Sequence, residues 1–138
     1  MPTPYLIDTN VISELARKRP DAGVVRFIAE QRSLHVSVIL FHELAFGLEN
    51  AAPGQKARLT VFIAAMRAHF GARAVSVDLQ VAETAGRLRA LEKAQGRILT
   101  VADSLIGATA AVLGATLVKR NVKDFEKLGV PLINPFSD

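Results

Sequence analysis

The chain has 138 residues, half of them hydrophobic, which is the size of one domain with a packed core. It contains no cysteine, so disulfide bonds and thiolate metal sites are excluded, and we expect a reducing, cytoplasmic location. The formal net charge of +4 favours an anionic partner such as nucleic acid without identifying one. No basic region followed by an apolar run opens the sequence, and the longest apolar segment, 106–118, is too short to span a bilayer, so we expect neither a signal peptide nor a membrane anchor.

The first half of the sequence predicts strands that alternate with helices. Apolar residues run from 5 to 7 and stop at Asp8, the pattern of a short buried strand that ends in a carboxylate. Asn10 is the expected N-cap of the helix that follows, and Asp21 that of the next helix. Pro53-Gly54 is expected to break the chain before a long amphipathic helix. The helices expected in this half are 11–19, 22–31, 41–50 and 55–70, and the second strand is 34–40.

The second half continues the alternation. Asp78 and Thr100 are expected to cap helices, and Gly96 and Gly114 to end them. The helices expected here are 79–95, 101–113 and 123–128, and the strands are 74–77, 115–119 and an edge strand, 131–134. Strands alternating with helices predict an α/β fold, with a central, mostly parallel sheet of four to five strands flanked by helices on both faces. No repeat or linker divides residues 1–138, so we expect a single domain.

Three acidic residues occupy matching places in this predicted sheet. Asp8 ends the first strand, Glu43 is expected in the first turn of the helix after the second strand, and Asp103 in the first turn of the helix before the fourth. Ligands collect at the carboxyl ends of parallel strands, and carboxylates gathered there repel one another unless a cation compensates. Oxygen ligands alone suit Mg²⁺ or Mn²⁺. The pattern therefore indicates a divalent-cation site at this end of the sheet, although each acid taken alone also fits an Asx turn, a first-turn acid or a capping pair.

At these residues the sequence resembles the PIN-domain ribonucleases, and more closely the VapC-type toxins of toxin–antitoxin pairs, including their FitB-like relatives. The resemblance covers nearly the whole chain, and its strength is in the order and spacing of several short motifs. Those motifs are Asp8-Thr9-Asn10 with Val11-Ile12-Ser13-Glu14, Glu43-Leu44 ahead of Gly47, Ala102-Asp103 with Ile106-Ala108, Arg120-Asn121 with Asp124-Phe125, and Ile133-Asn134-Pro135-Phe136.

The resemblance implies a PIN-like fold and a Mg²⁺- or Mn²⁺-dependent endoribonuclease. Asp8, Glu43 and Asp103 match the family's core metal-binding acids. The chain departs from the family at the fourth acidic position, where Lys119-Arg120-Asn121 replaces the common Thr-Arg-Asp. Either Asn121 supplies a neutral oxygen or Asp124, one helical turn on, supplies the charge, and we favour Asp124 as a supporting residue. The implied partners are a small antitoxin, a second copy in a homodimer, and operator DNA bound by a larger toxin–antitoxin assembly.

Hydrolysis of a phosphodiester needs an activated water and relief of charge on the phosphate, and a metal ion supplies both. We therefore expect Asp8 and Asp103 to hold the principal ion and Glu43 to ligate it or orient the water, with RNA held by basic side chains at the rim. Single-stranded or looped RNA is the expected substrate, with tRNA among the candidates, because its phosphates and bases are accessible. The supporting or substrate-binding residues that we expect are Thr9, Asn10, Ser104, Lys119, Arg120 and Asn121.

Two other functional classes fit parts of the pattern. A receiver-like phospho-acceptor domain has similar length and strand-end acids, with Asp8 and Asp78 as its acids and Lys119 as its lysine, but its paired acids after the first strand are missing and Glu43 would have no role. A non-catalytic PIN-fold module that binds nucleic acid is the other alternative, because the fourth acidic position is weakened. Phosphorylation by acetyl phosphate and a metal-dependent RNase assay distinguish these from the nuclease.

Overall fold

The computed structural model describes residues 3–120 and 129–137. Its sheet has four parallel strands in the order β2-β1-β3-β4, so the first strand of the chain lies inside the sheet between the second and the third. The strands are β1 (Tyr5–Ile7), β2 (Leu34–His35), β3 (Thr116–Val118) and β4 (Leu132–Ile133). The α/β fold with a parallel sheet of four strands confirms the predicted class, and β4 is at the edge, where the last strand was expected.

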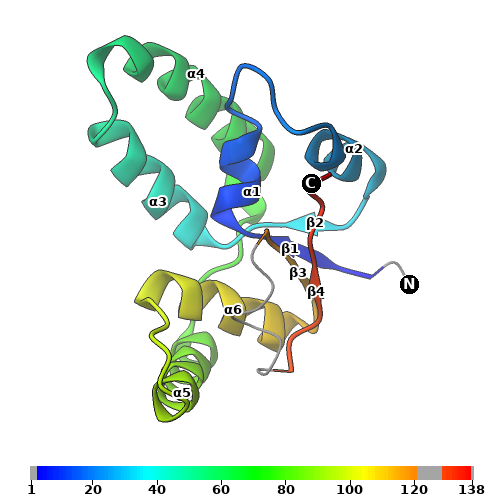
Figure 1. Ribbon diagram of the computed structural model, residues 1–138, viewed down its shortest axis with the longest axis vertical. Coiled ribbons are helices and arrows are strands. Elements are labelled where there is room, and N and C mark those ends of the chain that lie inside the picture. The colour runs from blue at the N-terminus through cyan, green and yellow to red at the C-terminus, as the bar shows by residue number, and fades with distance from the viewer. Residues whose placement is uncertain (1–2, 121–128, 138) are drawn as a thin grey trace.

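Helices cover both faces of this sheet (Figure 1). The helices are α1 (Thr9–Glu14), α2 (Ala22–Glu30), α3 (Val38–Glu49), α4 (Pro53–Phe70), α5 (Leu79–Ala94) and α6 (Val101–Leu113), and a short 3-10 helix, η1 (Gly71–Arg73), follows α4. Helices α1 to α4 lie on one side, with α3 and α4 as an antiparallel pair, and α5 and α6 lie on the other. Within the described residues, no helix is long and apolar enough to cross a membrane.

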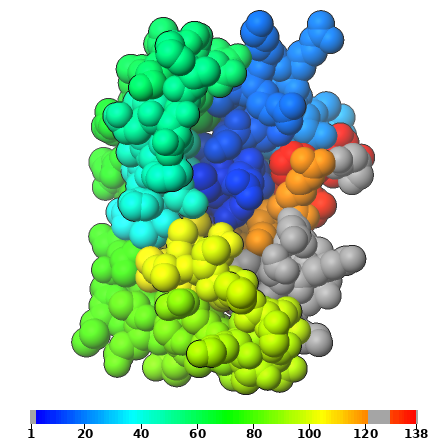
Figure 2. All heavy atoms as spheres, turned by 60° about the vertical axis from the view of Figure 1, so that its left-hand side comes forward, coloured from blue at the N-terminus to red at the C-terminus, as the bar shows by residue number. Residues whose placement is uncertain are grey.

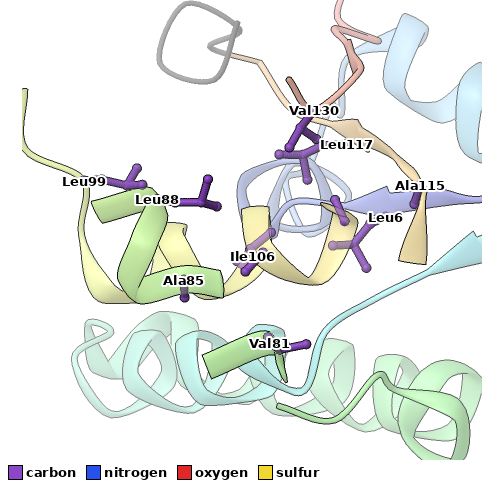
Figure 3. Packing of buried hydrophobic residues seen from close by; sticks show 11 residues of the cluster. Leu6, Val81, Ala85, Leu88, Leu99, Ile106, Ala115, Leu117 and Val130 are labelled. Carbon is purple, nitrogen blue, oxygen red and sulfur yellow. The ribbon is translucent and has the colours of Figure 1, made fainter. Parts of the chain in front are cut away.

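Side chains of the two central strands, β1 and β3, point alternately to the two faces of the sheet and contribute to a hydrophobic core on each face. Leu6 and Leu117 point into the cluster formed with α5 and α6, whereas Ile7 and Val118 point into the cluster formed with α1 to α4. Figure 3 shows the first cluster, in which Ile106 of α6 lies close to Leu6. Central strands that are buried on both faces are typical of parallel sheets. Because the strands are parallel, the residues that follow β1 and β3 lie at the same end of the sheet.

Two of the expected strands were wrong in extent. The predicted strand 34–40 ends at His35, because the Ser37 side chain accepts a hydrogen bond from the Ile39 backbone N–H (3.1 Å) and caps α3, which begins at Val38. The predicted strand 74–77 is reduced to one parallel bridge between Ser37 and Val75. The first error arises because a short run rich in β-branched residues fits a strand or a helix equally well, and here the Ser37 cap decides.

The start of two helices also differs from the prediction. Asp8, not Asn10, is the N-cap of α1; its side chain accepts a hydrogen bond from the Asn10 backbone N–H (3.4 Å), and the helix ends at Glu14 rather than at residue 19. Pro53 does not break the chain but occupies the first turn of α4, where its missing N–H costs nothing. The caps Asp21, Asp78 and Thr100 are confirmed. The predicted helix 123–128 lies outside the described residues.

The C-terminal segment after β4 lies on the N-terminus of α2 (Figure 1). The Ser137 backbone N–H and hydroxyl both donate to the Asp21 carboxylate, the hydroxyl at 2.7 Å. These hydrogen bonds from Ser137 hold the pKa of Asp21 below its usual value. Gly23 has no room for a side chain, because a Cβ there would meet the Pro135 carbonyl oxygen. The segment is therefore tied to α2 by specific polar contacts and by close backbone packing.

Candidate active site

Asp8 lies where the central strand β1 meets α1. Its backbone N–H donates to the Val118 carbonyl of β3 (2.9 Å), so Asp8 still takes part in the sheet while its side chain caps the helix. The residue is only 5% exposed. A buried carboxylate at the carboxyl end of a parallel sheet is in the position where ligands bind in open α/β folds.

Glu43 reaches this end of the sheet from α3. Because α3 begins at Val38, Glu43 lies in the second turn of the helix and not in the first turn, as the sequence had suggested. The Thr9 hydroxyl donates a hydrogen bond of 2.6 Å to Glu43 Oε1, which joins α1 to α3 beside Asp8. This contact fixes one carboxylate oxygen of Glu43 and leaves its other oxygen for a further partner.

Asp103 approaches from the opposite layer. It lies in the first turn of α6, as predicted, and its backbone N–H donates to the Thr100 side-chain oxygen (3.1 Å). The next residue, Ser104, is fully buried and donates its hydroxyl to the Val101 carbonyl (2.6 Å), which makes it part of the helix rather than a group open to a ligand. Figure 2 shows the start of α6 below the start of α1, with α3 on one side and the end of β3 on the other.

The pKa of Asp8 reflects its burial and the charged groups around it. Burial raises the pKa of Asp8 above its usual value, and the negative charges of Asp103 and Glu43 raise it further. The positive charge of Lys119 and the hydrogen bond from the Asn10 backbone act in the opposite direction. The three acids of the predicted constellation are thus near enough to influence one carboxyl group, together with a lysine.

The donor atoms suit a hard divalent cation, although they are not arranged as a finished metal site. Carboxylate and hydroxyl oxygens are the ligands that Mg²⁺ and Mn²⁺ prefer, and the mutual repulsion at Asp8 is what a cation would relieve. Across residues 3–120 and 129–137, however, no three acidic or histidine side chains lie close enough to hold one ion together. The donor atoms of Asp8, Glu43 and Asp103 thus suit such an ion in kind, and these side chains would have to move closer together to hold it.

The remaining predicted residues lie in different surroundings. Asn10 is exposed, and its described contact is the backbone hydrogen bond to Asp8. Lys119 is buried after β3, while the Arg120 guanidinium lies over the Phe136 ring, 4.5 Å from its centroid. Asn121 and Asp124 fall outside the described residues, so the choice between them stays open.

One basic pocket was missed by the sequence reasoning. It has a volume of about 480 Å³, and its lining residues are Gly86, Arg89, Ala90, Lys93, Arg97, Ile98 and Leu99. Arg97 is paired with the buried Glu92 (2.6 Å), and Ile98 beside it is 97% exposed. The spacing of 86, 89, 90 and 93 along α5 was a usable signal, since it places these residues on one face of the helix, whereas Arg97 follows the end of α5. The pocket belongs to the end of α5 and contains none of the three acids.

Comparison with known proteins identifies what this arrangement is similar to. The sequence pattern of the PIN domain matches residues 5–131. The chain is 35% identical to the VapC ribonuclease Y4jK of Sinorhizobium fredii, over 95% of this chain and 96% of that protein, and 31% identical to the toxin FitB of Neisseria gonorrhoeae, over 96% and 99%. The structure of FitAB bound to a DNA fragment superposes with a TM-score of 0.81 at 27% identity, covering 95% of this chain and 94% of that one.

Proposed function

Because the chain belongs to the PIN-domain family, as a FitB-like VapC ribonuclease toxin of a toxin–antitoxin system, we propose that it is a Mg²⁺- or Mn²⁺-dependent endoribonuclease with its active site at the carboxyl ends of β1 and β3. The observation that carries the proposal is the buried Asp8 carboxyl group, whose pKa is raised by burial and by the charges of Asp103 and Glu43. Carboxylates are brought together against their repulsion at sites that bind cations or carry out acid–base chemistry.

The PIN nucleases are typically metal-dependent, and oxygen donors from three elements support the same dependence here. Asp8 and Asp103 are proposed to hold the principal ion, since one is buried at the end of β1 and the other enters from α6. When bound by these residues, a divalent ion would supply a water of lowered pKa and positive charge for the phosphoryl and leaving oxygens. The fourth position is proposed to determine whether a second ion binds, because Asp124 would add a carboxylate and Asn121 only a neutral oxygen.

The residues of the chain contribute orientation and charge. Glu43, held through one oxygen by Thr9, is proposed to orient the attacking water with the other. Asp124 is proposed as a supporting acid after β3, and Asn121 as a neutral alternative. The positive side chain of Arg120, and Lys18 and Arg19 after α1, are proposed to bind RNA phosphates, which gives an affinity that depends on salt but not on base sequence.

The proposed substrate is single-stranded or looped RNA, with tRNA as one candidate. The chain has one tyrosine and no tryptophan, so stacking platforms for bases are sparse. A phosphodiester in an exposed loop can approach the buried Asp8 carboxylate more easily than a phosphodiester in a regular duplex. Base specificity would then come from the shape of the loop more than from stacking.

The proposed partners are a small antitoxin, a second copy of this chain, and operator DNA. The similar FitAB pair has a solved structure bound to a DNA fragment, which supports a higher toxin–antitoxin assembly that binds DNA. We propose that the antitoxin inhibits by bringing a basic side chain to the acids, where it would replace the charge of the ion. The receiver-like alternative is set aside by the family, and Asp78, which it required, caps α5.

The test is RNA cleavage by Asp8→Asn, Glu43→Gln and Asp103→Asn in saturating Mn²⁺. Each substitution keeps the shape of the side chain and removes its charge, and each should lower turnover by about a hundredfold or more. Asp78→Asn is the matched control: it makes the same chemical change at an exposed acid whose role is to cap α5, and asparagine preserves that cap. Undiminished turnover in all three variants would rule out this active site, and a wild-type chain without metal-dependent RNase activity would favour the non-catalytic binding module.

A further inference from the structure

Lys119 is buried at the acidic end of the sheet. In the parallel register, Ile7 of β1 pairs with Val118 of β3. The residues that follow them, Asp8 and Lys119, therefore lie next to each other at the carboxyl ends of the two strands. Backbone hydrogen bonds hold both positions, since the Asp8 N–H donates to Val118 and the Lys119 N–H to Ile133 (3.0 Å). Only 7% of Lys119 is exposed.

A lysine so deeply buried needs negative charge close to it, because an isolated ammonium group is very costly away from water. The acids at this end of the sheet are Asp8, Asp103 and Glu43.

We infer that Lys119 is a resident cation of the acidic site, which neutralises part of the charge of Asp8 and thereby weakens the binding of divalent cations there. The inference rests on the proposed function for the identity of the site. An ammonium group and a divalent ion that neutralise the same carboxylates repel each other, so each makes the other less favourable. Lys119 is accordingly a positioning residue for charge, not a group that contacts RNA.

The measurement is Mn²⁺ binding to the full chain by titration calorimetry, at low ionic strength, for the wild type and Lys119→Met. Methionine keeps most of the unbranched apolar stem and removes the ammonium group. We expect Lys119→Met to bind Mn²⁺ about tenfold more tightly, and Lys119→Arg, which keeps the charge, to resemble the wild type. Lys93→Met controls for the loss of one positive charge elsewhere, because Lys93 lines the α5 pocket and not the acidic site.

Thermal melting supplies a second readout that does not depend on activity. Without divalent ions, Lys119→Met should melt below Lys93→Met, since its acids have lost their cation. Saturating Mn²⁺ should raise the melting temperature of Lys119→Met more than that of the wild type, because a tighter ligand stabilises more. A purely structural lysine would lower the melting temperature equally with and without Mn²⁺.

The outcomes separate this inference from the proposed function. Equal Mn²⁺ affinity in the wild type and Lys119→Met, or weaker binding by the variant, would overturn the inference and leave the nuclease proposal standing. If neither protein bound Mn²⁺, the proposed metal chemistry and the inferred competition would both fall. If Lys119→Met failed to fold, Lys119→Thr would take its place, and an affinity unchanged from the wild type would overturn the inference.

Discussion

The hydrogen bond between Thr9 and Glu43 offers the sharpest test of how the site is built. It spans 34 positions in the sequence, joins α1 to α3, and is short, with 2.6 Å between Thr9 Oγ1 and Glu43 Oε1. Replacing Thr9 by valine keeps the branched shape and removes the donor. Thr9→Ser is the matched control, because it keeps the hydroxyl and removes only a methyl group.

The magnitude follows from the charge and the burial of the pair. A hydrogen bond to a charged group contributes about 1.5–3 kcal/mol, and Glu43 is only partly buried, so water replaces part of the lost contact. We expect Thr9→Val to lose about 1.5 kcal/mol of unfolding free energy, which corresponds to roughly 6 °C in Tm for a domain of this size. Turnover should also fall, by about tenfold, because Glu43 is then free to adopt other rotamers.

The assay combines urea unfolding with cleavage of a fluorogenic RNA. A double-mutant cycle with Glu43→Gln separates the pairwise contribution from the cost of each substitution. If Thr9→Val matched Thr9→Ser in both stability and turnover, the contact would contribute neither stability nor orientation. The proposed part of Thr9 in holding Glu43 would then be refuted.

Three other predictions concern charge and packing. The raised pKa of Asp8 means that the folded state binds the Asp8 proton more tightly than the unfolded state does. The stability that this proton contributes is therefore present below the usual Asp pKa of about 4 and is lost as pH rises through the folded pKa. Asp8→Asn should accordingly raise the Tm of the metal-free protein at neutral pH, and the gain should vanish in a melting series below about pH 4. Arg97→Met leaves the Glu92 carboxylate, whose side chain is 3% exposed, without its cation, and should cost roughly 3 kcal/mol in urea unfolding. Gly23→Ala forces a methyl group against the Pro135 carbonyl and should cost about 1–3 kcal/mol, with faster proteolysis of the C-terminal segment.

Matched controls accompany these variants. Gly86→Ala makes the same change as Gly23→Ala at a helical glycine with open space around it, and it should stabilise the protein by about 0.5–1 kcal/mol. Adding Glu92→Gln to Arg97→Met should recover part of the loss, because the uncompensated charge is then removed. A loss as large in the double variant would show that the arginine stem, not the ion pair, carries the stability.

The sequence predicted most of the order of the elements and the secondary-structure positions of two of the candidate acids. Asp8 was placed correctly at a strand end and Asp103 in a helix first turn, because local patterns mark both kinds of position. The start of α3 was missed because the run at 36–40 fits both periodicities, and only the Ser37 cap separates them. Local patterns thus locate an element better than they locate its ends.

Contacts between helices and strands that are distant in the sequence could not be predicted from local sequence patterns. Glu43 was expected one turn earlier in its helix, and its approach to Thr9 depends on how α3 packs against α1. The burial of Lys119 follows from its place beside the two central strands, which composition does not reveal. The α5 pocket depends on how Arg97 is held by Glu92 after the helix ends, and such packing emerges only when the whole chain is assembled.

The place of β1 between β2 and β3 has a consequence during synthesis. In the order of synthesis, Asp8 precedes its neighbours on one side, Asp103, Lys119 and the strand 116–118, by most of the length of the domain. A nascent toxin that is interrupted before residue 116 lacks the strand that must pair with β1, so it has no assembled site.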